Sequence, residues 1–162
     1  MTLSTLLQAQ LKQGKVKLLE GNLLALDPGE TTGYCIFNPQ GVLIAQGQER
    51  TWPLESCIPV ISKLLEAYQP KAVVFESYQV YSWKTEDHSW SQIPTVQVIG
   101  CVKTLIILAN ISYFQQTAQV AKQFVSDQRL KDWNMWFVGI RHARDAIRHA
   151  CYFLLFGPKN SS

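Results

Sequence analysis

Hydrophobic positions in the first half of the chain predict one helix followed by three strands. Leucines recur at helical spacing among polar residues within 2–20, which predicts a helix. A continuous apolar run at 23–26 predicts a buried strand that ends at Asp27. Two further short strands are predicted at 34–37 and 42–48, with an Asn-Pro-Gln-Gly turn between them. The three strands together predict an antiparallel meander.

Helical and strand patterns alternate in the second half of the chain. The predicted elements are a helix at 53–68, a strand at 72–75 that ends at Glu76, a polar and aromatic loop at 77–94, a helix at 95–110, a strand at 111–115, a short helix at 118–125, a loop at 126–139 and a helix at 140–156. Pro59 predicts that the regular part of the first of these helices begins near it, because proline is tolerated in a first turn. A meander followed by βαβ units predicts an α/β fold with a five-stranded mixed sheet flanked by helices.

Composition indicates a soluble protein with one domain of ordinary size. Apolar residues make up 47% and charged residues 17% of the 162 residues, which is enough for a sizeable core. The four cysteines form no CxxC pattern, so we expect reduced thiols and an intracellular protein. The longest apolar stretch, 96–109, is interrupted by Gln97 and Lys103 and is too short to cross a bilayer, so we expect no membrane partner.

Charge is unevenly distributed along the chain. The net charge is +3, but residues 27–100 carry four basic and eight acidic residues, whereas residues 101–162 carry eight basic and three acidic residues. This arrangement suits a protein that holds cations with carboxylates and a polyanion with Arg and Lys. The alternative is a mixed surface whose charge segregation has no function.

Two carboxylates stand at the ends of buried strands. Asp27 follows Leu-Leu-Ala-Leu, and Glu76 follows Ala-Val-Val-Phe. If the two strands are parallel neighbours, their ends lie about 5 Å apart, and a divalent cation would relieve the repulsion between the acids. The alternative is that each acid accepts hydrogen bonds from a turn. Gly29 and Gly33 are expected to permit the tight turn and a close backbone approach.

The last predicted helix carries a third acid beside imidazoles and guanidiniums. At about 100° per residue, His142, Asp145 and His149 share an arc next to the buried stripe. The three arginines on the other side of Asp145 are Arg141, Arg144 and Arg148. The arc can deliver an acid and an imidazole to one ion. The alternative is an ordinary amphipathic helix with a solvated polar face.

Three segments, in this order, resemble the motifs of RuvC-type Holliday junction resolvases, above all their short bacteriophage versions. The segments are LALDPGETTGY at 24–34, AVVFE at 72–76 and HARDA at 142–146. The resemblance implies an RNase H-like fold, a homodimer and two-metal hydrolysis of phosphodiesters in branched DNA such as four-way junctions. It also implies the cytoplasm of a bacterial or phage-infected cell. We divide the chain into a helical extension at 1–21, a nuclease domain at 22–157 and a tail at 158–162.

The resemblance assigns Asp27, Glu76, His142 and Asp145 as catalytic and metal-binding residues. Hard oxygen ligands favour Mg²⁺, two ions per site, with Mn²⁺ as the alternative. We expect Asp27 to bridge both ions, and Glu76 and Asp145 to hold one side each. His142 is expected to be a ligand or a proton carrier, with a pKa that a neighbouring cation lowers. His149 is the rival for this role.

Basic and aromatic residues are candidates for DNA binding. The candidates for phosphate contacts are Lys122, Arg129, Lys131, Arg141, Arg144 and Arg148. The candidates for stacking on unpaired bases are Tyr78 and Trp83, with Tyr81 and Trp90 in the same loop. The alternatives are solvated charge and aromatic side chains that anchor the loop in the core.

The helix at 95–110 is the candidate dimer interface, because it is apolar on more than one face. We expect Val98, Val102 or Ile106 to remain for a partner subunit. The alternative is that the N-terminal helix covers these side chains.

Two other functions compete with cleavage of branched DNA. The sequence DPGETTG at 27–33 also resembles the first phosphate loop of actin-like ATPases and sugar kinases, but those folds need two such domains. A non-catalytic branched-DNA-binding protein is the other alternative. It would be favoured by a degraded site, whereas all four site positions hold residues that suit catalysis.

Overall fold

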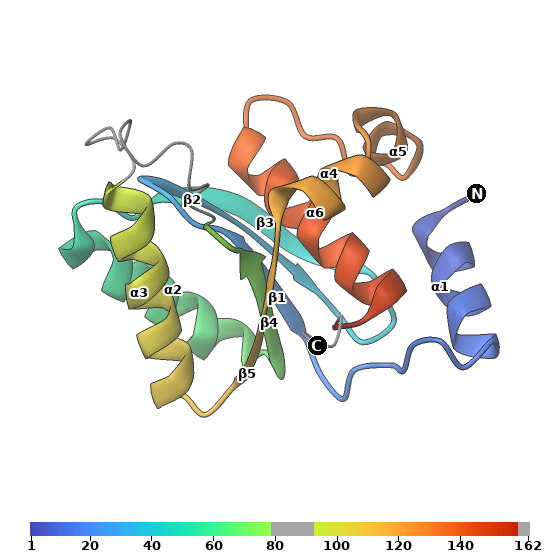
Figure 1. The fold of residues 1–162 in the computed structure, drawn as a ribbon, viewed down its shortest axis with the longest axis horizontal. Helices are drawn as coiled ribbons and strands as arrows, with labels where there is room; N and C mark the ends of the chain where they lie inside the picture. Colours follow the sequence, from blue (N-terminus) through green and yellow to red (C-terminus); the bar gives the residue numbers. More distant parts are fainter. Residues whose placement is uncertain (79–92, 159–162) are drawn as a thin grey trace, which may run out of the picture.

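The structure is a computed structural model that describes residues 1–78 and 93–158. Its centre is a five-stranded sheet with the strand order β3-β2-β1-β4-β5 (Figure 1). The strands are β1 (Leu23–Asp27), β2 (Thr31–Phe37), β3 (Leu43–Arg50), β4 (Ala72–Glu76) and β5 (Ser112–Gln116). The first three form the antiparallel meander, β4 runs parallel to β1, and β5 runs parallel to β4. The mixed α/β sheet that the sequence predicts is confirmed.

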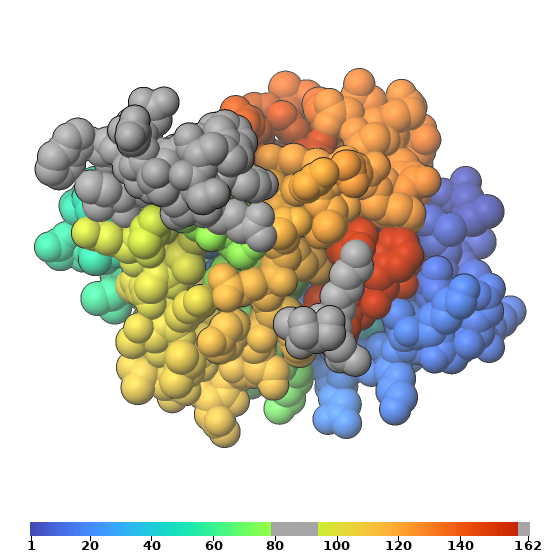
Figure 2. All heavy atoms as spheres, in the orientation of Figure 1, coloured from blue at the N-terminus to red at the C-terminus, as the bar shows by residue number. Residues whose placement is uncertain are grey.

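Helices cover both faces of this sheet. They are α1 (Leu3–Lys12), α2 (Leu54–Tyr68), α3 (Ile93–Leu108), α4 (Ala118–Phe124), α5 (Asp127–Asp132) and α6 (Arg141–Phe156). One face is covered by α2 and α3, and the other by α6 with α1, α4 and α5 around it (Figure 1). Figure 2 shows α1, in blue, beside the red C-terminal end of α6. None of the described helices is both long and apolar enough to span a bilayer.

Side chains alternate between the two faces along each strand, and this alternation positions the site. In β1, Leu23 and Ala25 pack in the core cluster that includes α6, whereas Leu24 and Leu26 pack in the cluster that includes α2 and α3. By the same alternation, Asp27 lies on the face of Leu23 and Ala25. The last residue of β1 is therefore directed to the α6 side of the sheet.

Two helix boundaries differ from the sequence prediction. The first helix ends at Lys12 rather than near residue 20, because Gly14 takes a left-handed φ of +65° just beyond it. The second helix begins at Leu54, so Pro59 lies inside it and does not mark its start. Pro59 and Glu55 are both exposed, so water can bind the carbonyl group that proline leaves without a partner.

The predicted loop at 126–139 contains a short helix, α5, that periodicity did not reveal. The Ser126 hydroxyl caps it by accepting a hydrogen bond from the Arg129 N–H at 3.3 Å. Six residues are too few for an apolar period to be recognised in the sequence.

The prediction for the free surface of α3 is wrong. Val98, Val102 and Ile106 are completely buried, in the core cluster that contains α2 and one face of the sheet. The N-terminal helix does not cover them either, because α1 packs on the α6 side. A helix that lies both on a sheet and beside a second helix buries two of its sides. The exposed large apolar side chains of α3 are Val96, Ile107 and Leu108.

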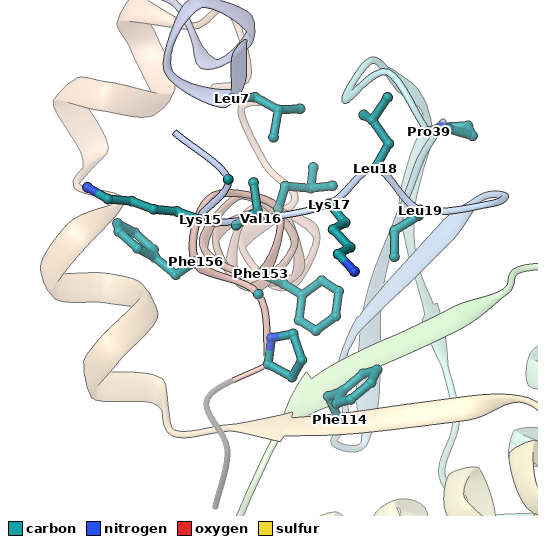
Figure 3. Close-up of a pocket in the computed structure, with 14 residues that line it drawn as sticks. Leu7, Lys15, Val16, Lys17, Leu18, Leu19, Pro39, Phe114, Phe153 and Phe156 are labelled. Carbon is teal, nitrogen blue, oxygen red and sulfur yellow. The ribbon is translucent and has the colours of Figure 1, made fainter. Parts of the chain in front are cut away.

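The segment between α1 and β1 forms one wall of an apolar pocket of about 400 Å³. Figure 3 shows Phe114, Phe153 and Phe156 around this pocket, with Lys15 and Lys17 beside them. The pocket lies at the C-terminal end of α6, and none of the described residues that line it is acidic. It is therefore separate from the carboxylates that the sequence singles out.

Candidate active site

One end of the sheet carries a row of five residues, one from each strand, which we call the end row. In strand order, the end row is Gln48, Gly33, Asp27, Glu76 and Gln116. Gly33 pairs with Gln48 and with Asp27, and Glu76 pairs with Gln116. Because Leu26 pairs with Phe75 in the parallel ladder, the two acids that follow them end neighbouring strands. The expected meeting of Asp27 and Glu76 is confirmed.

Gly33 lets the first turn of α6 lie directly on the end row. A Cβ atom at Gly33 would come within 2.0 Å of the His142 carbonyl carbon and oxygen. Gln48 fixes the same turn, because its Oε1 accepts a hydrogen bond from the His142 N–H at 3.3 Å. The expected close backbone approach at Gly33 is therefore confirmed, and it brings the HARDA segment to the acids.

His142 is bound to Asp27. Its Nδ1 lies 2.8 Å from Asp27 Oδ2, and the two side chains are 42% and 13% exposed. Burial raises the pKa of Asp27, the His142 hydrogen bond opposes this rise, and repulsion from the carboxylates of Glu76 and Asp145 adds to it. Asp27 therefore lies within electrostatic reach of both other acids.

The pKa of His142 is raised, mainly by its hydrogen bond to Asp27, although burial lowers it. The downward shift expected from the sequence belongs to a site that holds a cation, whose charge would act in the opposite direction. In the structure, the nearest charge is the Asp27 carboxylate. The imidazole therefore takes the position of a counter-ion.

His149 is bound to Glu76, one strand further along the end row. It is completely buried, with Nε2 3.2 Å from Glu76 Oε2 and Nδ1 3.0 Å from Gln116 Oε1. The two histidines of the predicted arc are therefore not equivalent. Each contacts a different acid, with His142 at Asp27 and His149 at Glu76.

Asp145 is buried and is held by two basic side chains. Arg148 Nη1 donates to its Oδ1 at 2.6 Å, and Lys122 Nζ lies 3.3 Å from its Oδ2. Arg148 also donates to the Asp127 carboxylate and to the Val125 carbonyl oxygen. Each guanidinium nitrogen of Arg148 therefore donates a hydrogen bond within the protein. Because the side chain is also buried, it does not lie on the exposed surface that a phosphate contact requires.

The donor set fits a hard divalent cation in its chemistry, although the side chains are not arranged as a cation cage. Asp27, Glu76 and Asp145 supply carboxylate oxygens, and their mutual repulsion at Asp27 is what a cation would relieve. Within residues 1–78 and 93–158, no three His, Cys, Asp or Glu side chains form a preformed metal site. Each acid is instead paired with a basic group, so a cation would have to replace some of these contacts.

The remaining candidates for DNA binding lie in different environments. Arg129 and Arg144 are half-buried and each lies over an aromatic ring, Phe124 at 4.1 Å and Trp136 at 4.3 Å. Lys131 lies 4.9 Å from the centroid of the Trp136 ring. The others are exposed Lys122 and Arg141, and half-buried Tyr78, which packs against the core cluster of α2 and α3. Trp83, Tyr81 and Trp90 lie outside the described residues.

Three residues around the site were missed in the sequence. Gln48 and Gln116 end up in the end row only through strand pairing, and nothing in their local sequence signals it. Trp136 lies in the predicted loop and packs against Arg144. Its position a few residues before a helix rich in arginine was a weak signal of this contact in the sequence.

No protein-family model matches this chain, and no curated protein matches it by sequence. Solved structures do match. RuvC of Thermus thermophilus in complex with a Holliday junction substrate is 14% identical, with a TM-score of 0.65 over 85% of this chain and 94% of that one. This chain has the fold of the Holliday junction resolvases.

Two further resolvases match the same fold. The yeast mitochondrial Holliday junction resolvase is 10% identical, with a TM-score of 0.60 over 96% of this chain and 84% of that one. The Holliday junction resolvase of fowlpox virus is 14% identical, with a TM-score of 0.54 over 82% and 96%. The expected RNase H-like architecture is confirmed by these resolvase structures.

Proposed function

We propose that the chain is a metal-dependent endodeoxyribonuclease that cleaves Holliday junctions or other branched DNA. The observation that carries this proposal is the convergence of Asp27, Glu76 and Asp145 at one end of a resolvase fold. Three carboxylates within electrostatic reach of one another are costly in the free protein, because like charges repel and burial penalises ionised acids. A site that must hold cations explains why this cost is retained.

Phosphodiester hydrolysis needs an activated water and a stabilised leaving oxygen. Two bound Mg²⁺ or Mn²⁺ ions would supply both. In our proposal, Asp27, Glu76 and Asp145 are the residues that hold the ions. His142 orients Asp27 and carries a proton at Nδ1 that can be released toward the site, and His149 orients Glu76. Lys122 and Arg148 hold the Asp145 carboxylate in place, and a bound cation would take the position of Lys122.

Branched DNA suits the charge of the last third of the chain. Residues 101–162 carry eight basic and three acidic residues, and exposed Lys122 and Arg141 stand next to Asp145. Phosphates of a junction arm would contact these side chains and arrive beside the acids. The RuvC structure that matches this chain contains a Holliday junction substrate, which supports the choice of DNA.

We also propose that the chain acts as a homodimer, because a four-way junction has to be cut in two strands to be resolved. The exposed apolar side chains Val96, Ile107 and Leu108 of α3 are the surface that suits this contact. They take the place of Val98, Val102 and Ile106, which the sequence predicted as the dimer interface and which the fold buries.

A non-catalytic protein that binds branched DNA is the second candidate. It is favoured by one observation, namely that each acid already has a basic partner within the protein. In a binding protein these pairs would be permanent. In a nuclease they would be present only until metal ions bind.

Cleavage of labelled synthetic DNA separates these two candidates. Four-way, three-way, flap and linear duplexes would be incubated with the protein and Mg²⁺, Mn²⁺ or EDTA. We expect cuts in the branched molecules with either metal, no cuts with EDTA and little cleavage of linear duplex. Selective binding of the four-way junction without cleavage under either metal would support the binding protein instead.

A further inference from the structure

A basic pocket of about 430 Å³ adjoins Asp145 on the side of α6 that faces α4 and α5. The lining residues used below are Lys122, Trp136, Arg141, Arg144, Asp145 and Arg148. This pocket differs from the apolar pocket at the other end of α6, because charged groups dominate its lining. Its contact with Asp145 connects it to the candidate active site.

The basic groups of this pocket are only partly neutralised. Arg148 is bonded to Asp145 and Asp127, so its single positive charge offsets one of these two carboxylates, and Lys122 offsets the other. Lys122 contacts Asp145, but its side chain remains 43% exposed. Arg141 is exposed and makes no hydrogen bond or ion pair with the other described residues. With four basic groups against two carboxylates in its lining, the pocket keeps a positive charge and is attractive to an anionic group.

Arg144 is held in the pocket by an aromatic ring and a backbone carbonyl group. Its guanidinium carbon lies 4.3 Å from the centroid of the Trp136 ring, and its Nη1 donates to the Phe137 carbonyl oxygen at 2.5 Å. A stacked and hydrogen-bonded guanidinium loses little freedom when a ligand arrives. Lys131 Nζ lies 4.9 Å from the centroid of the same ring, so two basic side chains already contact the indole.

We propose that this pocket binds one unpaired nucleotide of the DNA substrate. The base stacks on the guanidinium of Arg144, and the phosphate contacts Arg141 and Lys122. Splayed-out bases stack on arginine planes as they do on aromatic rings, whereas paired bases in a duplex offer no free face. The inference rests on the proposed function and makes it more specific, because it selects branched DNA with unpaired nucleotides beside the cut.

Binding of short oligonucleotides without metal tests this pocket. Fluorescence anisotropy in EDTA would compare labelled pentathymidylate with an abasic pentamer of equal charge. We expect wild-type protein to bind the thymidylate about tenfold more tightly. Arg144→Lys keeps the charge but loses the plane, so it should bind both pentamers with the affinity that the wild type has for the abasic one.

Two further variants serve as controls. Arg141→Gln removes one charge, so it should weaken both pentamers equally and keep the tenfold preference. Trp136→Leu removes the support of Arg144 and should reduce the preference even if Arg144→Lys fails to fold, which thermal unfolding would reveal. Equal wild-type affinity for the two pentamers, or a preference that survives both Arg144→Lys and Trp136→Leu, overturns the proposal.

This test is independent of cleavage. If the base preference depends on Arg144 but no branched DNA is cut under either metal, the pocket stands and the nuclease proposal fails. If branched DNA is cut but the two pentamers bind equally, the nuclease proposal stands and the nucleotide pocket fails.

Discussion

At the scale of single residues, the site consists of three acid–base pairs that involve one helix. His142 contacts Asp27, His149 contacts Glu76, and Arg148 contacts Asp145. Each basic group reduces the cost of holding a carboxylate in a partly buried position. The pairs also orient the carboxylate oxygens, which are the ligands that Mg²⁺ prefers.

Asp27→Asn should abolish cleavage and stabilise the free protein. Loss of a charged ligand should reduce the cleavage rate about a hundredfold or more. The pKa of Asp27 is raised in the folded state, mainly by burial, so its ionised form destabilises the fold above the unfolded pKa. We therefore expect a higher Tm for Asp27→Asn at pH 8 in EDTA.

The exposed Glu30→Gln, in the same turn, is the matched control and should change neither quantity. A lower Tm for Asp27→Asn than for wild type would mean that the hydrogen bond to His142 outweighs the cost of burial.

The contribution of His142 to stability should depend on pH. Its pKa is raised in the folded state, chiefly by Asp27, so its stabilising effect is complete below the unfolded value of about 6.5 and is lost as pH rises through the folded pKa. The difference in Tm between wild type and His142→Ala should therefore be larger at pH 6 than at pH 9. An unchanged difference across this range would contradict a charged pair with Asp27.

Cleavage by histidine variants should separate the two imidazoles. His142→Asp should remain partly active because it restores an oxygen ligand, whereas His142→Ala should lose most activity. His149→Ala leaves Glu76 without its basic partner, so we expect a higher metal requirement that added Mn²⁺ partly offsets. Metal titrations of junction cleavage by the three variants would check this. Normal cleavage by His142→Ala together with an inactive His149→Ala would exchange their roles.

At the scale of elements, the site depends on the contact between α6 and the end of the sheet. The helix crosses the end row from Gln48 on β3 to Gln116 on β5, contacting it through His142 and His149. At Gly33 the backbone of α6 leaves no room for a Cβ atom. A helix that touches all the strand ends can bring its side chains to acids on two different strands.

Gly33→Ala should move α6 away from the acids. A Cβ there would lie 2.0 Å from the His142 backbone, and overpacking of this kind costs about 1–3 kcal/mol of unfolding free energy. Cleavage should fall with it, because His142 would no longer reach Asp27. Gly100→Ala is the matched control, since a Cβ there meets nothing within 4 Å and the residue lies inside α3, where alanine is favoured. Chemical denaturation and junction cleavage would measure both effects.

The strands and the three acids could be predicted from the sequence because their signals are local. The apolar runs before Asp27 and Glu76 end at the same edge in any parallel pair, and the HARDA segment carries its own helical period. The contacts of His149 with Gln116 and of Arg148 with Asp127 depend on how α6 crosses the sheet and α5, which no local pattern encodes. The DNA-binding assignments remain predictions.

At the scale of the whole molecule, the proposed dimer and the proposed DNA surface lie on different layers. The exposed apolar residues of α3 are on the α2 side of the sheet, and the basic residues around Asp145 are on the α6 side. Two copies joined through α3 would leave both candidate sites free for two strands of one junction.

Ile107→Glu combined with Leu108→Glu should prevent dimer formation. Charges placed at the centre of an apolar contact are not compensated, so we expect a monomer at concentrations where the wild type is dimeric. Sedimentation equilibrium would measure the change. Ile58→Glu on α2, also exposed, is the matched control and should leave the dimer intact. A wild type that is monomeric at every concentration would remove α3 as an interface.

The dependence of three acid–base pairs on α6 has a practical consequence for anyone who wishes to control this protein from outside. All three acids take their orientation from one rigid rod of 16 residues, whose far end is exposed at Phe156. A tether or a light-switchable cross-link attached there would move the whole helix and so disturb all three acid–base pairs at the same time. Reversible inhibition should then need only one attachment point, at the end of α6 opposite His142 and Asp145.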